Sequence, residues 1–345
     1  MNTTHIAVDL AKSVFQVAVS HSPGRIAEEH RLPRPRFRSF FLHRPPSHVL
    51  MEACGSAHHW GREIQALGHQ VSLLPASHVA RYRLGNKTDR ADTRAILEAA
   101  RNEKITPVPV KSLDQQAITA LHRLRSGYLA SRTARINAVR GLLGEFGIPI
   151  PKGARSFLTN AHRALDHDLI PAYLREALFQ ALEEVRELET KADTLKDQLQ
   201  RLGDNIPTVQ YLLTVPGIGV LSATALFSTV GVIHRFRSGR SLANYLGLTP
   251  REFSSGFRRR MGRISKRGDA YTRMLLVHGA RSALLAAHRV QEPDQLQAWA
   301  IRTAKARGHN TATVALANRI ARIVWRVWRD QRPFQRYPLV QEVPA

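Results

Sequence analysis

The hydrophobic pattern of the chain changes once, near residue 112, and this change limits the folds that the sequence can adopt. Before it, short β-rich runs alternate with helical segments, and after it the pattern is helical almost throughout. Strands that alternate with helices favour a mixed α/β sheet, whereas a long helical remainder forms a layer or domain of its own. The sequence therefore predicts an α/β fold followed by an α fold, and 345 residues suffice for two or three domains.

The first hundred residues carry the strand signals. The expected strands are Ile6–Asp9, Val14–Val19, His48–Glu52 and Val71–Leu74, with a weaker one within residues 25–32. Helices are expected over residues 56–67 and 89–103. The first two strands are close enough in the sequence to pair across a turn. We predict that residues 1–110 form one mixed-sheet domain.

A heptad-like repeat of leucines and other apolar residues lies in the middle of the chain, residues 111–205. Its members, spaced mostly by alternating threes and fours, are Leu178, Leu182, Val185, Leu188, Ala192, Leu195, Leu199 and Leu202. This spacing is typical of a coiled-coil seam, although a single amphipathic helix facing a core has a similar pattern. We predict a helical region with a coiled coil, either antiparallel within the chain or between subunits.

The third part, residues 206–345, begins with a segment that carries no charge. Residues 211–233 are long enough to cross a membrane, but Pro216-Gly217-Ile218-Gly219 interrupts them. We predict two short helices around a tight turn, a helix-hairpin-helix-like element. The backbone N–H groups at Gly217 and Gly219 could then hold a phosphate, although a plain turn between helices is equally compatible.

The charge balance indicates the kind of partner. Lys and Arg number 51 against 27 Asp and Glu, a net charge of +24. Such an excess implies a polyanion, with nucleic acid the leading candidate and an anionic membrane surface the second. No signal peptide is recognisable, and one cysteine, Cys54, excludes an internal disulfide. We expect a cytoplasmic protein without a membrane segment.

Four acidic residues stand out because a chain this basic has few of them. Asp9 and Glu52 each end a predicted strand, and Asp89 and Asp92 lie three apart at a predicted helix start, hence on one face. Clustered carboxylates attract divalent cations. Two such ions can stabilise the attacking oxygen and the leaving oxygen in phosphodiester cleavage. The alternatives are local: Asp89 could cap its helix, and Asp9 could be a turn residue.

A serine pair lies within the most basic stretch. Ser254 and Ser255 precede Gly256, and the cations around them are Arg251, Arg258, Arg259, Arg260, Arg263, Lys266 and Arg267. Guanidinium groups beside a hydroxyl can bind a phosphate and neutralise the charge that develops during attack. Alone, however, Ser-Ser-Gly is a common turn and the cations could serve only to contact phosphates.

The order of these motifs resembles that of a known family. In chain order they are Asp9, Met51–Gly55, Asn86–Asp92, the helical middle, Val215–Gly219, Gly247–Pro250, Ser254–Gly256 and Gly262–Asp269. Each is weak alone, but together, over residues 5 to 330, they resemble the DEDD transposases of bacterial insertion sequences. The matching subgroup carries the signature Ile-Ser-Lys-Arg-Gly-Asp, residues 264–269 here.

The resemblance implies a RuvC-like (RNase H-type) first domain, a coiled-coil middle and a mostly helical C-terminal transposase domain. It implies magnesium bound by Asp9, Glu52, Asp89 and Asp92, and Ser255 as the nucleophile, with Ser254 as the adjacent alternative. It further implies an element-encoded guide RNA that pairs with target and donor DNA, and a homo-oligomer, dimer or tetramer. Arg90, between the two aspartates, departs from the family pattern, but on a helix it would point away from both carboxylates.

Three functions remain open at this point. In the first, the metal-binding acids and Ser255 act on one phosphate, and the serine forms a transient DNA–protein ester that strand exchange resolves. In the second, the chain is a metal-dependent junction nuclease that cleaves with water and never links to DNA. In the third, it is a non-enzymatic protein that packages DNA or RNA with its basic surface.

Overall fold

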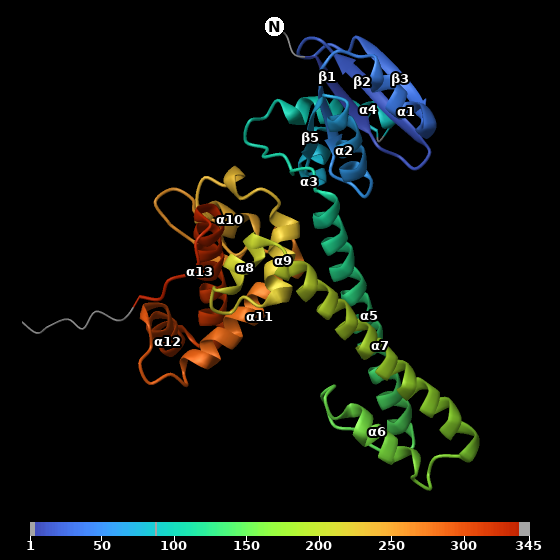
Figure 1. The fold of residues 1–345 in the computed structure, drawn as a ribbon, viewed down its shortest axis with the longest axis vertical. Helices are drawn as coiled ribbons and strands as arrows, with labels where there is room; N and C mark the ends of the chain where they lie inside the picture. The colour runs from blue at the N-terminus through green and yellow to red at the C-terminus, as the bar shows by residue number, and fades with distance from the viewer. Residues whose placement is uncertain (1–3, 87, 338–345) are drawn as a thin grey trace, which may run out of the picture. The chain divides into compact units, whose positions relative to one another are not determined.

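The computed structural model describes residues 4–86 and 88–337, and it divides into two compact units, residues 1–113 and 114–345 (Figure 1). Lys87, within the motif at residues 86–92, lies outside the described residues. The predicted division into three parts, with boundaries at residues 110 and 205, stays a prediction.

The first unit is built on a five-stranded mixed sheet with the order β3-β2-β1-β4-β5. Its strands are β1 (His5–Asp9), β2 (Val14–Ser20), β3 (Glu28–Pro33), β4 (His48–Glu52) and β5 (Gln70–Leu74). The first three pair antiparallel, whereas β4 lies parallel to β1 and β5 parallel to β4. The predicted mixed sheet is confirmed, and its order is consistent with an RNase H-like domain.

Helices cover both faces of this sheet (Figure 1). They are α1 (Arg34–Leu42), α2 (Ala57–Ala66), the short α3 (Ala76–Val79) and η1 (Ala80–Tyr82), and α4 (Asp89–Ala100). On one face α1 and α2 pack against Ile6 and Val8 of β1. On the other face α4 packs against Ala7 of β1 and Leu50 of β4. Burial on both sides explains why β1 is apolar at successive positions, since neighbouring residues of a strand point to opposite faces.

Three helices open the second unit: α5 (Leu113–Glu145), α6 (Phe157–Leu165) and α7 (Ala172–Asp204). The ion pairs Arg132–Glu189, 3.0 Å, and Arg135–Glu184, 2.7 Å, join α5 to α7. Residue numbers rise along one helix as they fall along the other, so the two helices run antiparallel.

The predicted heptad-like repeat is buried or half-buried from Leu178 to Leu199, and only its last member is exposed. Leu178, Leu182 and Val185 pack into one core with α5 and α6, whereas Leu202 is 41% exposed. Ala192 and Leu199, further along the repeat, are also fully buried, so the repeat up to Leu199 serves packing within the chain. A coiled coil, within one chain or between subunits, stays a prediction.

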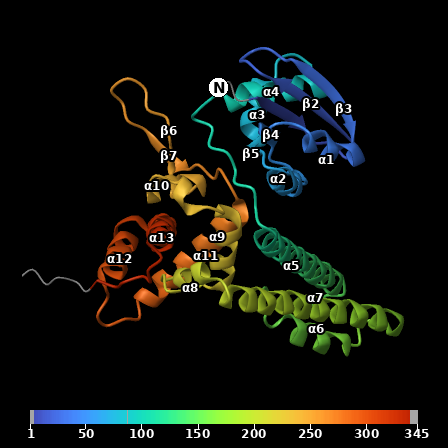
Figure 2. The same ribbon diagram turned by 45° about the horizontal axis from the view of Figure 1, so that its top comes forward.

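The remaining helices form the largest core of the molecule. They are α8 (Pro207–Leu213), α9 (Val220–Val230), η2 (Ile233–Arg235), α10 (Gly239–Tyr245), α11 (Ala270–Ala287), α12 (Gln295–Arg307) and α13 (His309–Asp330). Leu226, Leu284 and Ile320, from three of these helices, are fully buried in it. A two-stranded sheet, β6 (Pro250–Glu252) and β7 (Met261–Ile264), interrupts the helices. Figure 2 shows this hairpin extending away from the helices of its own unit.

The charge-free segment at residues 211–233 forms the two short helices α8 and α9 around a turn, as predicted. Gly217, with a φ of 80°, provides the turn, and its carbonyl oxygen faces Gly279 of α11 so closely that a Cβ on Gly279 would lie 1.8 Å from it. The turn therefore packs directly on a helix. Among residues 4–86 and 88–337, the structure contains no helix that is long and apolar enough to cross a membrane.

A buried histidine connects three helices of the second unit. His122 of α5 lies 3.0 Å from the Thr224 hydroxyl of α9 and 3.0 Å from the Tyr271 hydroxyl of α11. The Thr224 hydroxyl donates to the carbonyl oxygen of Val220, so it accepts from the Nε2–H of His122. The Nδ1 of His122 then accepts from Tyr271. This pattern requires a neutral imidazole.

We expect the second unit to lose stability as the pH falls from 6.5 towards 4. Burial, and secondarily the charge of Arg125, lower the pKa of His122 from 6.5 to about 4, against a smaller opposing effect of Asp269. Between these values the unfolded chain binds a proton that the folded one does not, so acidification favours unfolding, by about 1.5 kcal/mol between pH 6.5 and 5. Urea unfolding at the two pH values measures the change. The difference should shrink in His122→Gln, and an equal pH dependence of both proteins would contradict this assignment.

Candidate active site

Two of the four predicted acids lie at the same end of the sheet, where the parallel strands β1 and β4 finish; we call this end the acidic edge. Asp9 and Glu52 are the last residues of the parallel neighbours β1 and β4, directly after the register pair Val8–Met51. Ala7, two residues before Asp9, packs on the α4 side of the sheet, as does Leu50 before Glu52. Because side chains alternate along a strand, Asp9 and Glu52 also point to the α4 side.

The other two acids lie at the start of α4. Thr88 is the N-cap, because its hydroxyl accepts from the N–H of Ala91 at 3.2 Å. The alternative that Asp89 serves as the cap is therefore wrong. Asp92 is only 8% exposed and lies one turn before Ala95, which packs on the sheet, whereas Asp89 is exposed.

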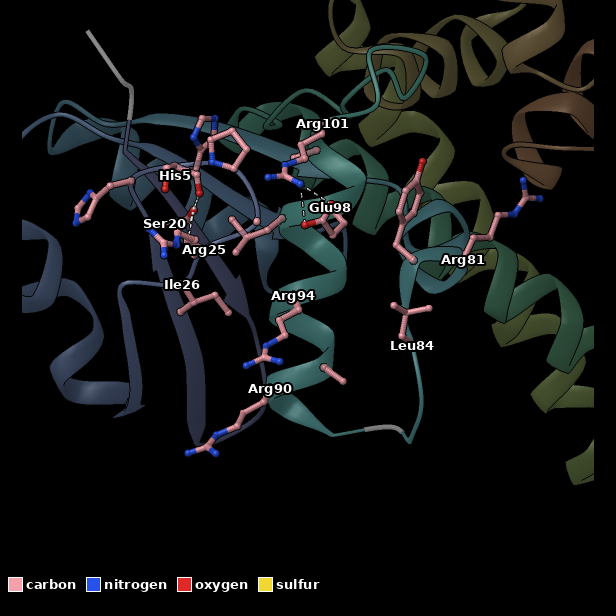
Figure 3. Close-up of a pocket in the computed structure, with 18 of the residues that line it drawn as sticks. His5, Ser20, Arg25, Ile26, Arg81, Leu84, Arg90, Arg94, Glu98 and Arg101 are labelled. Atoms are coloured by element: carbon pink, nitrogen blue, oxygen red, sulfur yellow. Dashed lines mark hydrogen bonds and ion pairs between the residues drawn. The ribbon is translucent and has the colours of Figure 1, made fainter.

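The direction of α4 brings its start to the acidic strand ends. In Figure 3, Arg101 at the far end of the helix lies near His5 at the start of β1, and Arg90 marks the opposite end of the helix. The helix thus runs antiparallel to β1 and begins near the edge at which β1 ends. The topology assigns all four carboxylates to one edge, on one side of the sheet.

The side chains are nevertheless not gathered into a metal-binding group. Within the part of the chain that the structure describes, no three His, Cys, Asp or Glu side chains are close enough to hold an ion. Asp92 instead forms an ion pair with Arg83, from the loop before α4. The four carboxylates therefore offer the oxygen ligands that magnesium prefers, but in this structure one of them, Asp92, is paired with the Arg83 guanidinium.

A basic cleft lies along the outer side of α4 and was not predicted as a site. It has a volume of about 1230 Å³ and lies between α4 and the turn that joins β2 to β3 (Figure 3). Its arginines are Arg25, Arg81, Arg90, Arg94 and Arg101. Arg90 and Arg94 pair with Glu29, at 3.2 and 3.6 Å, so Arg90 does point away from Asp92 as expected. The spacing of four between Arg90 and Arg94 was the available signal, since it places both on one helix face.

The serine pair lies on the β6–β7 hairpin, where the sequence suggested only a turn. Ser255 and Arg258 exchange two backbone hydrogen bonds, 3.2 and 3.1 Å, around a two-residue turn of Gly256 and Phe257. Gly256 takes a φ of 53° and Phe257 does not have a positive φ, the pattern of a type II′ turn. The turn type therefore explains the glycine after Ser255.

The two serines have different surroundings. The Ser254 hydroxyl donates to Glu252, at 2.7 Å, and accepts from the backbone N–H of Arg260, at 3.2 Å. The Ser255 hydroxyl makes no hydrogen bond to any residue that the structure describes, and the residue is exposed. Ser254 thus holds the hairpin together, whereas Ser255 remains available.

The cations of the hairpin divide between its two faces. Arg259 approaches Glu252 at 3.9 Å, on the face that also carries Ser254. Arg258 lies directly opposite Ser255 in the ladder, and opposite residues of an antiparallel pair share a face. Ser255 therefore shares its face with a guanidinium that has no carboxylate partner among residues 4–86 and 88–337.

The other predicted nucleic-acid contacts are of two kinds. Arg251 donates to the carbonyl oxygen of Ser265 at 3.0 Å, and Gly217 is packed against α11, so both have structural roles. Gly219 is the exposed N-cap of α9, with no atom within 4 Å of where a Cβ would lie. The remaining predicted contacts are all exposed and are Arg258, Arg259, Arg260, Arg263, Lys266 and Arg267. Their contact with nucleic acid stays a prediction.

A sheet with RNase H-like strand order and acidic strand ends, in a chain with an arginine-rich hairpin, is consistent with a protein that processes nucleic acids. Known proteins specify the family. A model described as the Transposase IS116/IS110/IS902 family matches residues 209–300, and a DEDD transposase model of the IS110 type matches residues 6–148. The chain belongs to this IS110/IS116 family of DEDD transposases.

Full-length relatives agree with this assignment. A protein named "Probable family 20 transposase" from Pseudomonas aeruginosa is 42% identical over 94% of this chain and 96% of its own length. The transposase for insertion sequence element IS1111A from Coxiella burnetii is 33% identical over 96% of this chain and 91% of its own. The transposase for IS1328 from Yersinia enterocolitica is 33% identical over 94% and 96%. The chain is thus an insertion-sequence transposase, a class that acts on DNA.

Proposed function

We propose that this transposase exchanges DNA strands with a magnesium-binding acid cluster, Asp9, Glu52, Asp89 and Asp92, and with Ser255 as nucleophile. The Ser255 oxygen attacks a DNA phosphorus, an Oγ–P bond forms, and the P–O bond to one strand breaks. The hydroxyl proton passes to the departing strand oxygen. A second strand end then attacks the same phosphorus and releases the serine. Each step replaces one phosphodiester with another, so the reaction needs no ATP.

The observation that carries this proposal is the exposed Ser255 hydroxyl, which is without a hydrogen-bond partner among the described residues. A nucleophile must be free to approach phosphorus, and Ser255 is, whereas Ser254 is engaged by Glu252 and by the backbone of Arg260. Arg258, opposite Ser255, supplies positive charge for the phosphate oxygens. The geometry therefore favours Ser255 over its neighbour.

The acidic edge fits a magnesium site in the chemistry of its donors. Asp9 and Glu52 would supply ligands from the strand ends, and Asp89 and Asp92 from the start of α4. Bound there, magnesium would stabilise negative charge on the attacking and leaving oxygens. Arg83 pairs with one oxygen of Asp92, Oδ1, so the other carboxylate oxygen would be the one to bind the metal, with Arg83 orienting the group.

The basic cleft beside α4 supports a path for a nucleic-acid backbone towards the acids. It reaches Thr88 and Ala91, which flank Asp89 in sequence, and its arginines outnumber Glu98, the one acid in its lining. Phosphates could compete with Glu29 for Arg90 and Arg94, because the two arginine side chains are largely exposed, although Glu29 itself is only 24% exposed. The cleft would add affinity for the phosphates of a nucleic acid, whatever its sequence.

The proposed chemistry includes partners as well as residues. The acids and Ser255 must reach one phosphate, from one chain or from two protomers. The active form in this proposal is a homo-oligomer, a dimer or a tetramer, as the family resemblance implies. An element-encoded guide RNA selects the donor and target DNA, and the reaction takes place in the cytoplasm. The net charge of +24 supports binding of two polyanions.

Sequencing of RNA that co-purifies with the protein, prepared without nuclease treatment, tests the guided reaction. We expect one dominant transcript from DNA that flanks the gene of this protein. Bulk cellular RNA without such enrichment would contradict RNA guidance, while leaving the strand-transfer chemistry to be tested on its own with DNA substrates.

A metal-dependent nuclease is the second candidate, favoured by one observation. Carboxylates at the ends of the parallel neighbours β1 and β4 are donors that metal-dependent hydrolysis by water would use, without any serine. The two functions differ in whether DNA becomes covalently bound to the protein, which the Ser255 variant decides.

A further inference from the structure

The tip of the β6–β7 hairpin exposes an aromatic ring. Phe257 is the second residue of the turn and is 112% exposed relative to a reference peptide. Single exposed apolar residues are common on protein surfaces and need no explanation. Phe257 differs because of where it lies, between the proposed nucleophile and three consecutive arginines.

The hairpin backbone fixes the point from which the Phe257 side chain extends. The paired hydrogen bonds of Ser255 and Arg258 close the turn, and the N–H of Phe253 donates to the Arg260 carbonyl oxygen at 2.8 Å. The Phe253 ring is itself partly covered, because it packs over Gly262, where a Cβ would lie 2.7 Å from it. Of the two phenylalanines on the hairpin, only Phe257 is therefore fully available to a partner.

Charge identifies the kind of partner. An apolar protein surface would not favour a tip that carries Arg258, Arg259 and Arg260 beside the ring. DNA satisfies both features, because its phosphates pair with guanidinium groups and its bases stack on aromatic rings. Proteins that insert an apolar side chain between bases use this combination to unstack and kink the duplex.

We propose that Phe257 is a nucleobase-binding residue, which stacks on an unpaired or unstacked base next to the phosphate that the hairpin engages. The turn places Phe257 two residues from Ser255, so a base held on the ring would help fix the adjoining phosphodiester relative to the Ser255 hydroxyl. The inference builds on the proposed role of the hairpin at DNA, but it concerns binding and does not require the serine chemistry.

Equilibrium DNA binding of variants in a Ser255→Ala background tests it, because no strand can then be captured. The probes are a short duplex and the same duplex with one unpaired adenine. We expect Phe257→Ala to weaken binding of the second probe by about 5- to 150-fold, the range for one stacked base. Phe257→Trp should restore it, whereas Phe257→Leu, which keeps an apolar side chain without a ring, should not.

Salt dependence and two controls make the result specific. Phe257→Ala should leave the slope of log affinity against log salt unchanged, whereas Arg258→Ala should reduce it by about 1. Tyr173→Ala, at a tyrosine that is 87% exposed on α7, should bind both probes like the parent protein. Equal affinity of Phe257→Ala and the parent for the unpaired probe would overturn the proposal. Full affinity of Phe257→Leu for the unpaired probe would overturn it too. So would a loss of affinity that accompanies self-association, measured by sedimentation, and does not depend on the unpaired base.

Discussion

Replacing Ser255 with alanine is expected to abolish covalent capture of DNA and to reduce strand exchange by at least about 10³-fold, because no other group replaces a missing nucleophile efficiently. DNA binding should persist, since Arg258, Arg260 and Arg263 remain. A denaturing gel with end-labelled DNA detects the covalent product. The protein should remain folded, because the Ser255 side chain is exposed and makes no hydrogen bond within the described residues.

Ser254→Ala is the matched control for this experiment. It removes the hydrogen bonds to Glu252 and Arg260, which loosens the hairpin by about 1 kcal/mol but leaves the Ser255 hydroxyl in place. Covalent capture should therefore continue. Loss of capture in Ser254→Ala together with normal capture in Ser255→Ala would exchange the two roles. Strand cleavage that persists in Ser255→Ala without any adduct would favour the nuclease.

The sheet was predictable because its signals are local. Four strands of the first unit are short, mostly apolar runs bounded by turn residues, and burial on both faces makes β1 apolar at successive positions. The exception is β3, Glu-Glu-His-Arg-Leu-Pro, which is polar and gave only a weak signal. Helix α1 was not predicted, because Pro35 suggests an interruption and Pro33 offers no polar cap. Proline is tolerated in the first helical turn, and Phe37 and Phe41, four residues apart, fix this helix on the sheet.

The β6–β7 hairpin was not predicted for a different reason. Residues 250–263 are all exposed, so no alternation between a buried and an open face marks them as strands. Their register comes from backbone hydrogen bonds and from Gly256, neither of which has a hydrophobic signature. The sequence therefore located the serines but could not show that Ser254 is engaged and Ser255 free. The preference for Ser255 rested on the family resemblance.

The acidic edge was predictable in its members but not in its state. Strand ends and a helix start can be read locally, which is why Asp9, Glu52, Asp89 and Asp92 were named. The ion pair between Arg83 and Asp92 and the basic cleft depend on how a loop and the β2–β3 turn fold against α4. Such contacts join segments that the sequence does not relate to one another.

Among the four acids, Asp89 offers the clearest test of the metal site. Asp92→Asn would leave Arg83 without its carboxylate in a partly buried place, so lost activity could reflect lost stability. Asp89 is exposed in the first turn of α4, where an acid adds only about 0.3–1 kcal/mol through the helix dipole. Asp89→Asn should therefore stay folded, lose about 10³-fold in DNA cleavage and keep its DNA affinity.

Asp114→Asn is the corresponding control, because Asp114 is also an exposed acid in the first turn of a helix, α5. Manganese binding, measured by electron paramagnetic resonance without DNA, gives a readout independent of activity: Asp89→Asn should bind more weakly, while Asp114→Asn and Ser255→Ala should bind like the parent protein. Unchanged manganese binding and cleavage in Asp89→Asn would exclude Asp89 from the site.

If the acids and the serine act from different protomers, a mixture of Asp89→Asn and Ser255→Ala should recover strand exchange that neither variant has alone, because mixed oligomers then contain one complete set of groups.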